Sequence, residues 1–251
     1  MSSSAASSSA AASSSASAIS SALGSPDKGF LQGRYCAVEP LSFDRHGESF
    51  WLALSGEDQD VLFKYMLFGP FDSADKYNIW FKGLETALGR VYYSIIDKSN
   101  DNVVGIFCYL AIVPEFGSIE LGSVTFTASM RRSVLGTEAV YLMMKYAMGE
   151  LRYRRFEWKC DNDNSRSKDA ATRYGFTLEG IFRQHMIIRG KNRDTAYFSI
   201  IDKEWNTFIN PSFQQWLAED NFDKSNNSQF LSLKAIRDRI LASNIGSLQS
   251  D

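Results

Sequence analysis

Residues 118–138 read SIELGSVTFTASMRRSVLGTE, and this stretch decides the fold. It begins as a strand in which apolar and polar residues alternate, and it ends where a helix begins. A strand that stops at a loop opening a helix presents free backbone N–H groups, which suit a phosphate. The stretch therefore predicts an α/β domain that can hold a phosphate-bearing cofactor.

The apolar alternation within this strand slips by one residue. Ile119 and Leu121 are apolar at odd positions, whereas Val124 and Phe126 are apolar at even positions. Because strand side chains alternate with a period of two, the slip indicates one inserted residue, and a glycine is its usual place. We therefore predict a β-bulge at the glycine–serine pair 122–123, which would splay this strand from its neighbour.

The rest of the folded region mixes strands with helices. Periodicity and turn residues predict strands over 34–40, 91–97, 103–112, 118–126, 154–160, 181–189 and 195–202. They predict helices over 44–54, 135–149, 165–174, 211–218 and 232–242, and a helical, aromatic-rich region over 58–89 that is broken at 69–70. Some of these strands would be joined by hairpins and others by crossover connections, which indicates an α/β (α+β) sheet domain.

The chain divides into three parts. Residues 1–29 are a Ser/Ala-rich tail that cannot bury enough apolar surface to offset its ordering entropy, so we expect disorder there. The folded domain is expected over 30–205, and a C-terminal helical extension over 206–251. The tail lacks the basic start and apolar core of a secretory signal, and no arginine precedes Arg34. We expect a cytoplasmic protein, with mitochondria and the nucleus left open.

Composition narrows the kind of partner. The net charge of −2 predicts neither a nucleic-acid nor a membrane partner, and no apolar run approaches the roughly 20 residues that span a bilayer. The two histidines, His46 and His185, are too far apart for a zinc site, so no metal is expected. The cysteines Cys36, Cys108 and Cys160 lie in apolar runs and are expected to be buried free thiols.

Several short motifs follow one another in order. They are Arg131-x-x-Val134-x-Gly136, Thr137-Glu138-Ala139, Arg155-Phe156-Glu157-Trp158-Lys159, Asn164-x-x-Ser167, Ala170-Ala171-x-Arg173-x-Gly175-Phe176, Glu179-Gly180-x-x-Arg183, Arg193-Asp194-Thr195 and Glu204-Trp205. Together, over about residues 34–205, they resemble the GNAT family of acyl-CoA-dependent N-acetyltransferases, specifically its RimJ/RimL-type branch. Val134 departs from the family pattern, which has its first glycine at this position.

The resemblance implies a GNAT fold, with a mixed, mostly antiparallel central sheet, a β-bulge, splayed strands and flanking helices. It implies that acetyl-CoA lies between the strands over 118–126 and 154–160. By resemblance, Asn164 bonds the pantetheine arm and Ser167 lies near the thioester sulfur, while helix capping is the alternative role for this pair. The residues expected to bind the cofactor are Val124, Phe126, Arg131, Arg132, Val134, Leu135, Gly136, Thr137, Asn164 and Ser167.

The loop before the helix predicted over 135–149 has the properties of a diphosphate site. Backbone N–H groups over 134–137 would face the diphosphate of coenzyme A at the positive end of the helix dipole. Gly136 would let the backbone come close, and Arg131 or Arg132 could pair with a phosphate. The alternative is an exposed arginine pair at a helix start.

Two residues are candidates for proton transfer. Glu120, beside the predicted bulge, is the candidate base, because a primary amine must lose a proton before it attacks a thioester. A structural or substrate-orienting carboxylate is the alternative. Many family members place a tyrosine four residues before the glycine at 175, where this chain has Ala171. Either Ser167 or water would then protonate the leaving thiolate, or no acid is required.

These expectations add up to an acetyl-CoA-dependent N-acetyltransferase. The acceptor would be a primary amine that attacks directly in a ternary complex, and we favour a small molecule over a protein N-terminus. The chain would act as a monomer or homodimer. The alternative is a catalytically silent GNAT-like module that binds acyl-CoA or regulates.

Overall fold

The computed structural model describes residues 23–26, 29–223, 225 and 228–248. Most of the tail predicted to be disordered, residues 1–22 and 27–28, lies outside the described residues, so that prediction stays untested. Within the short described piece, Pro26 is buried and the Gly24 carbonyl accepts a hydrogen bond from the Tyr153 hydroxyl at 3.2 Å.

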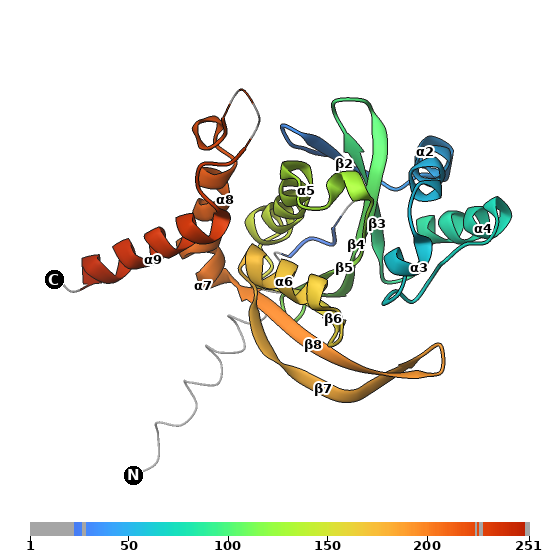
Figure 1. The fold of residues 1–251 in the computed structure, drawn as a ribbon. Coiled ribbons are helices and arrows are strands. Elements are labelled where there is room, and N and C mark those ends of the chain that lie inside the picture. Colours follow the sequence, from blue (N-terminus) through green and yellow to red (C-terminus); the bar gives the residue numbers. More distant parts are fainter. Residues whose placement is uncertain (1–22, 27–28, 224, 226–227, 249–251) are drawn as a thin grey trace, which may run out of the picture.

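An eight-stranded sheet forms the centre of the molecule, in the order β1-β2-β3-β4-β5-β6-β8-β7 (Figure 1). The strands are β1 Leu31–Gln32, β2 Cys36–Pro40, β3 Val91–Asp97, β4 Asn102–Val113, β5 Ser118–Phe126, β6 Arg155–Asp161, β7 Thr177–Ile188 and β8 Lys191–Ile201. Neighbours run antiparallel except β5 and β6, which run parallel. The mixed, mostly antiparallel sheet expected from the sequence is therefore confirmed.

Helices cover both faces of the sheet (Figure 1). They are α2 Phe43–Ser55, α3 Gln59–Leu62, α4 Ala74–Glu85, α5 Val134–Met144, α6 Ser165–Tyr174, α7 Asp202–Glu204, α8 Asn210–Trp216 and α9 Leu233–Leu248. Two stretches with wider, π-type turns, Lys145–Glu150 and Trp205–Ile209, continue α5 and α7. None of the helices in the described ranges is both long and apolar enough to cross a bilayer.

The two faces of the sheet carry separate apolar clusters. On one face α2 and α4 bury Phe50, Tyr77 and Phe81 against the sheet. On the other face α5, α6, α8 and α9 pack over Tyr109 and Phe156. The central strand β4 is apolar on both sides because both of its faces are covered, as expected for a central strand. A polar side chain on either covered face of the sheet is buried and therefore needs a hydrogen-bond or ion-pair partner. This requirement determines which polar residues lie together at the site.

The C-terminal helices are packed onto the domain. Tyr141 of α5 stacks on Phe213 of α8 with ring centroids 5.2 Å apart, and its hydroxyl donates to Asn210. Arg237 of α9 donates to the carbonyl of Arg173 at the end of α6. The extension therefore supports α5 and α6, the two helices that border the site.

Candidate active site

Strands β5 and β6 part after three residue pairs. Their parallel register joins Ser118 to Arg155, Ile119 to Phe156 and Glu120 to Glu157, and no later pair is present among the described residues. Both strands continue beyond this point, to Phe126 and Asp161. The sheet is therefore open between them along the stretch where the sequence predicted splayed strands.

The predicted bulge is present on β5. Cys108 of β4 pairs with Gly122 and Ile106 pairs with Thr125, so β5 carries one more residue than β4 between these pairs. Ser123 takes a left-handed conformation with φ of 52°, and its hydroxyl lies 3.2 Å from that of Tyr92. The bulge turns the end of β5 away from β6, and this is the physical cause of the opening.

Two of the expected cofactor residues follow the bulge. Val124 and Phe126 are half-buried and pack against the apolar cluster on the α5 face. A Cβ atom added at Gly136 would lie 3.6 Å from the Phe126 ring, so the end of β5 lies against the start of α5. Both residues therefore border the open part of the sheet and the helix start together.

The start of α5 presents two unpaired backbone donors. Ser133 is the N-cap, and its hydroxyl accepts the Gly136 N–H at 3.0 Å. No acceptor within the described part of the chain takes the N–H of Val134 or Leu135. These two groups lie at the positive end of the helix dipole, where an anion is most stable.

Gly136 is needed for a reason that the sequence did not reveal. A Cβ atom at this position would lie 2.6 Å from the carbonyl oxygen of Met130. The loop before α5 therefore folds directly onto the first turn of the helix. Thr137, buried in the same turn, donates to the Ser133 carbonyl and accepts a hydrogen bond from Arg173 of α6.

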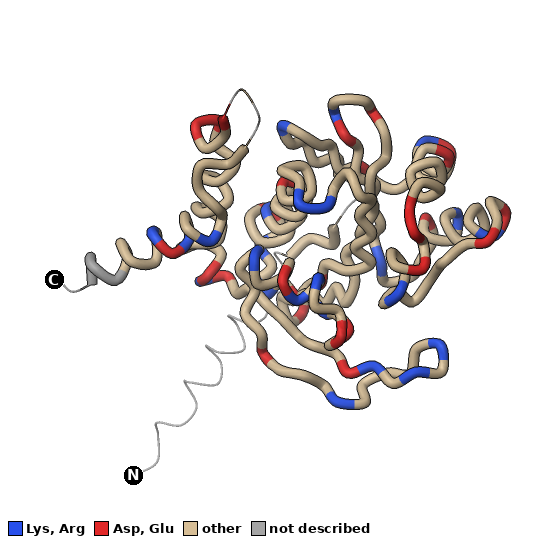
Figure 2. The backbone as a smooth tube through the Cα atoms, in the orientation of Figure 1, with Lys and Arg blue, Asp and Glu red and all other residues tan. Residues whose placement is uncertain are grey.

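The two arginines of the loop differ in their contacts. Arg131 donates to the Phe126 carbonyl at 3.1 Å and forms an ion pair with Glu57 at 2.8 Å. Glu57 also accepts the backbone N–H of Ala128 at 2.5 Å, so it holds the loop at two points. Arg132 is exposed, with φ of 59°. Figure 2 shows the two arginine positions next to each other in the loop before α5.

Asn164 and Ser167 begin α6 beyond the end of β6. The Asn164 side-chain oxygen accepts the Ser167 N–H at 3.1 Å, so Asn164 is the N-cap residue of this helix. The Ser167 hydroxyl accepts a hydrogen bond from the Trp158 indole N–H at 3.0 Å. Capping uses only the amide oxygen of Asn164. The Ser167 hydroxyl hydrogen, which Trp158 does not use, faces the Cys160 thiol, where burial raises the pKa and a hydrogen bond with Ser167 opposes the rise.

Glu120 lies at the point where the strands part, with its residue only 7% exposed. Lys159 of β6 pairs with it at 2.8 Å. Burial raises the pKa of the Glu120 carboxyl above its usual value, and the positive charge of Lys159 acts against that rise. A carboxylate with a raised pKa, next to the opening, has the properties of a general base.

No tyrosine takes the place of the missing acid in α6. Ala171 is fully buried, and the neighbouring Tyr174 packs on Trp158 and Phe213 in the core. Burial raises the pKa of the Tyr174 phenol. The Ser167 hydroxyl is therefore the candidate donor on this helix.

Sequence reasoning missed contacts that lie on the α2–α4 face. The Tyr65 hydroxyl donates to the carbonyl of Asp163, just before α6, at 3.1 Å. Arg189, at the turn of the β7–β8 hairpin, donates to the carbonyls of Phe68 and Gly69. The segment between α3 and α4 therefore contacts both the β7–β8 hairpin and the β6–α6 loop. The only features of the sequence that could have indicated these contacts were a tyrosine and an arginine located in turns.

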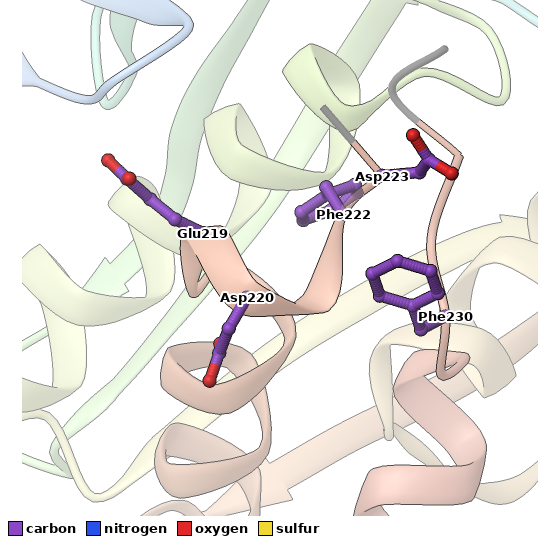
Figure 3. Close-up of a pocket in the computed structure, with 5 residues that line it drawn as sticks. All are labelled: Glu219, Asp220, Phe222, Asp223 and Phe230. Carbon is purple, nitrogen blue, oxygen red and sulfur yellow. The ribbon is translucent and has the colours of Figure 1, made fainter. Parts of the chain in front are cut away.

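Two hollows lie on the surface of the described residues. One of about 420 Å³ adjoins the start of α5 and is lined by Arg34, Tyr35, Asp97, Lys98, Ser99, Ser129, Ser133, Val134 and Leu135. Another of about 570 Å³ lies after α8, where acidic residues surround two phenylalanines (Figure 3). The described residues contain no group of histidine, cysteine, aspartate and glutamate side chains arranged to hold a metal ion.

Known proteins are similar to this chain in fold and in sequence. The family described as "Acetyltransferase (GNAT) domain" matches residues 48–177, about half of the chain. A GCN5-related N-acetyltransferase from Brucella melitensis is 37% identical, with a TM-score of 0.83, over 86% of this chain and 97% of its own. A probable GNAT-family acetyltransferase from Chromobacterium violaceum is 36% identical, with a TM-score of 0.69, over 74% and 92%.

Curated relatives are more distant. An uncharacterised N-acetyltransferase of Bacillus licheniformis is 28% identical over 59% of this chain and 90% of its own. The ribosomal-protein-serine acetyltransferase of Escherichia coli is 31% identical over 41% of this chain and 58% of its own. These similarities agree with the parted strands and the motifs, and they confirm the resemblance read from the sequence. The chain belongs to the GNAT acetyltransferase family and is an N-acetyltransferase.

Proposed function

We propose that this chain transfers the acetyl group of acetyl-CoA to a small primary amine, in a ternary complex. The observation that carries the proposal is the parting of β5 and β6 beside a helix start with two unpaired N–H groups. The free donors of Val134 and Leu135 suit a diphosphate, and Gly136 lets the loop before α5 fold onto the first turn of the helix, where these donors lie. These features support coenzyme A as the ligand.

The chain's own residues have distinct roles in this proposal. Val134 and Leu135 would hold the diphosphate, and the free amide N–H₂ of Asn164 would bond the pantetheine arm. When bound, acetyl-CoA supplies the activated acetyl thioester. Backbone N–H groups beside the bulge would polarise its carbonyl, an arrangement that stabilises developing negative charge.

Two residues would move protons. Glu120 would take the proton from the acceptor ammonium, directly or through one water, so that the neutral amine can attack. Ser167, whose hydroxyl hydrogen is not used by Trp158, would donate to the leaving thiolate. Thiols have a pKa near 8.5, so the thiolate leaves readily, and Ser167 is expected to matter less than Glu120.

A small acceptor fits the surroundings of Glu120 better than a protein chain. Tyr65 forms a hydrogen bond to the β6–α6 loop, and Arg189 forms one to the segment between α3 and α4. These two connections would leave less room for a protein chain than for a small molecule on the acceptor side. The Escherichia coli relative is named for a ribosomal protein acceptor, which makes a peptide N-terminus the competing possibility.

The test is acetyl-CoA consumption with a panel of primary amines and N-terminal peptides. We expect turnover with at least one small amine, and a loss of kcat of at least about a hundredfold in Glu120→Gln, the lower end of what general-base catalysis contributes. Coenzyme A affinity, measured by calorimetry, should be unchanged in this variant. Turnover of peptides alone would contradict the small acceptor, and coenzyme A binding without any turnover would favour a silent module.

A further inference from the structure

Lys159 lies between two carboxylates at the point where the strands part. Its ammonium is 2.8 Å from Glu120 Oε2 and 2.8 Å from Glu157 Oε2. It also lies over the ring of Tyr197, 5.1 Å from the centroid. The side chain is 19% exposed, so three neighbours fix an ammonium that is largely withdrawn from water.

The second carboxylate is itself held in place. Arg155 donates to Glu157 at 2.6 Å and forms two hydrogen bonds to Glu179 of β7, at 2.5 and 2.8 Å. Glu179 also accepts a hydrogen bond from Ser199 of β8. Alternating negative and positive side chains therefore form a row from the edge of the sheet inward, in the order Glu179, Arg155, Glu157, Lys159 and Glu120. These contacts hold the Lys159 ammonium in one position.

From this geometry we infer that Lys159 is a positioning residue, which keeps the Glu120 carboxylate ionised and directed toward the acceptor amine. The inference rests on the proposed function, in which Glu120 takes the proton from that amine. Lys159 does not touch the reacting atoms in this account. It acts through Glu120 alone.

Other charges around Glu120 bear on its ionisation. The titratable and charged groups that act on it are Glu157 and Lys159 of β6, Arg193 of β8, Arg90 just before β3, and Cys108 of β4. Tyr197 and Tyr92 lie one contact further away, against Lys159 and Arg90. Burial is the main cause that raises the pKa of Glu120, and Glu157 adds to it, whereas Lys159 is the principal opposing group and Arg193 a weaker one. Without Lys159, burial and repulsion from Glu157 would leave Glu120 protonated up to a higher pH.

Three variants separate charge from structure. Lys159→Met removes the ammonium and keeps an apolar chain of similar length, while Lys159→Arg keeps the charge. Lys234→Met is the matched control, because Lys234 forms an exposed ion pair with Asp238 at 2.6 Å on α9. For each protein, kcat/KM would be measured against pH with the best amine, and the Glu120 carboxyl would be titrated directly by carbon-13 NMR in labelled protein.

We expect the acid limb of the Lys159→Met profile to move up by about one pH unit or more, as loss of a close opposite charge typically does. The NMR midpoint of Glu120 should move with it, and KM for acetyl-CoA should stay within about twofold because a positioning role affects the base alone. Lys159→Arg and Lys234→Met should keep the wild-type midpoint.

Two results would overturn the inference. An NMR midpoint of Glu120 that is the same in Lys159→Met and wild type would show that the ammonium does not set its ionisation. A uniform loss of rate at every pH would show a merely structural role. Wild-type activity in Glu120→Gln would instead contradict the proposed function, because Glu120 would then not be the base. The NMR titration distinguishes the two failures, because it measures the ionisation of Glu120 without relying on turnover.

Discussion

The carboxylate of Glu57, just after α2, holds the guanidinium of Arg131 at 2.8 Å and the backbone N–H of Ala128 at 2.5 Å. This one side chain, only 9% exposed, connects the α2–α4 face to the loop that opens α5. Arg131 was one of two arginines, with Arg132, expected to pair with a phosphate, and in this structure its charge is already paired. Its contribution to cofactor binding would then be to order the loop.

Arg131→Ala should weaken coenzyme A binding by about tenfold or more, since a hydrogen bond to a charged group contributes about 1.5–3 kcal/mol. The loss comes from an unanchored loop and from a Glu57 carboxylate left unpaired near the diphosphate. Calorimetry on wild type, Arg131→Ala, Glu57→Ala and the double variant gives a complete cycle. The double variant should bind more tightly than Arg131→Ala alone. Equal affinities in wild type and Arg131→Ala would refute the anchoring role.

Glu138 fastens the first strands to α5. Its buried carboxylate accepts the backbone N–H groups of Arg34 and Tyr35 at 2.7 Å and of Cys36 at 2.9 Å. Glu138→Ala should lower the free energy of unfolding by about 3 kcal/mol, because three backbone donors lose a buried, charged acceptor. Urea unfolding measures it.

The control for this variant is Glu219→Ala. Glu219 contacts the same segment through an exposed ion pair with Arg34 at 3.3 Å, which should contribute less than about 1 kcal/mol. Similar losses in the two variants would mean that burial of the Glu138 carboxylate has no special part in stability.

His46 makes stability depend on pH. It is a buried residue of α2, its Nδ1 accepts the Ser42 N–H at 3.1 Å, and burial lowers its pKa below the usual value, while a contact with Glu39 opposes this. The folded state therefore binds a proton less readily than the unfolded state. Its stabilising effect is present above the unfolded pKa, about 6.5, and is lost as pH falls below it.

Urea midpoints between pH 5 and pH 8 test this for wild type and His46→Gln. The wild type should lose stability more steeply on acidification, with a slope of up to about 1.4 kcal/mol per pH unit from one proton. Parallel curves for the two proteins would show that His46 takes no proton on unfolding.

The sequence predicted several local features of the fold correctly. The slip in alternation between Leu121 and Val124 located the bulge. Side chains on a strand alternate with a period of two, so one inserted residue shifts the apolar positions by one. Gly175, with φ of 99°, ends α6 as expected of a glycine at a helix end. Three buried free cysteines were also expected and are confirmed.

Long-range partners were beyond sequence reasoning. The pairing of Lys159 with Glu120 depends on the parallel register of β5 and β6, and the pairing of Arg131 with Glu57 joins residues 74 apart in sequence. Strand β7 begins at Thr177, earlier than expected, because it is an exposed edge strand whose pattern lacks clear apolar alternation. The π-type turns after α5 carry no local signal either.

The central claim is that the free N–H groups at the start of α5 bind the diphosphate of coenzyme A. Val134→Pro deletes one of them and leaves the helix intact, because proline suits the first helical position and Ser133 before it is already extended (φ −99°, ψ 162°). Val134→Ala is the matched control for the lost side chain.

Calorimetric titration of wild type, Val134→Pro and Val134→Ala with coenzyme A is the most direct test. The account predicts that Val134→Pro binds at least about tenfold more weakly than Val134→Ala, as expected for a lost hydrogen bond to a charged group, with an unchanged melting temperature. Equal affinity in the two variants would contradict it, because the diphosphate would then lie elsewhere.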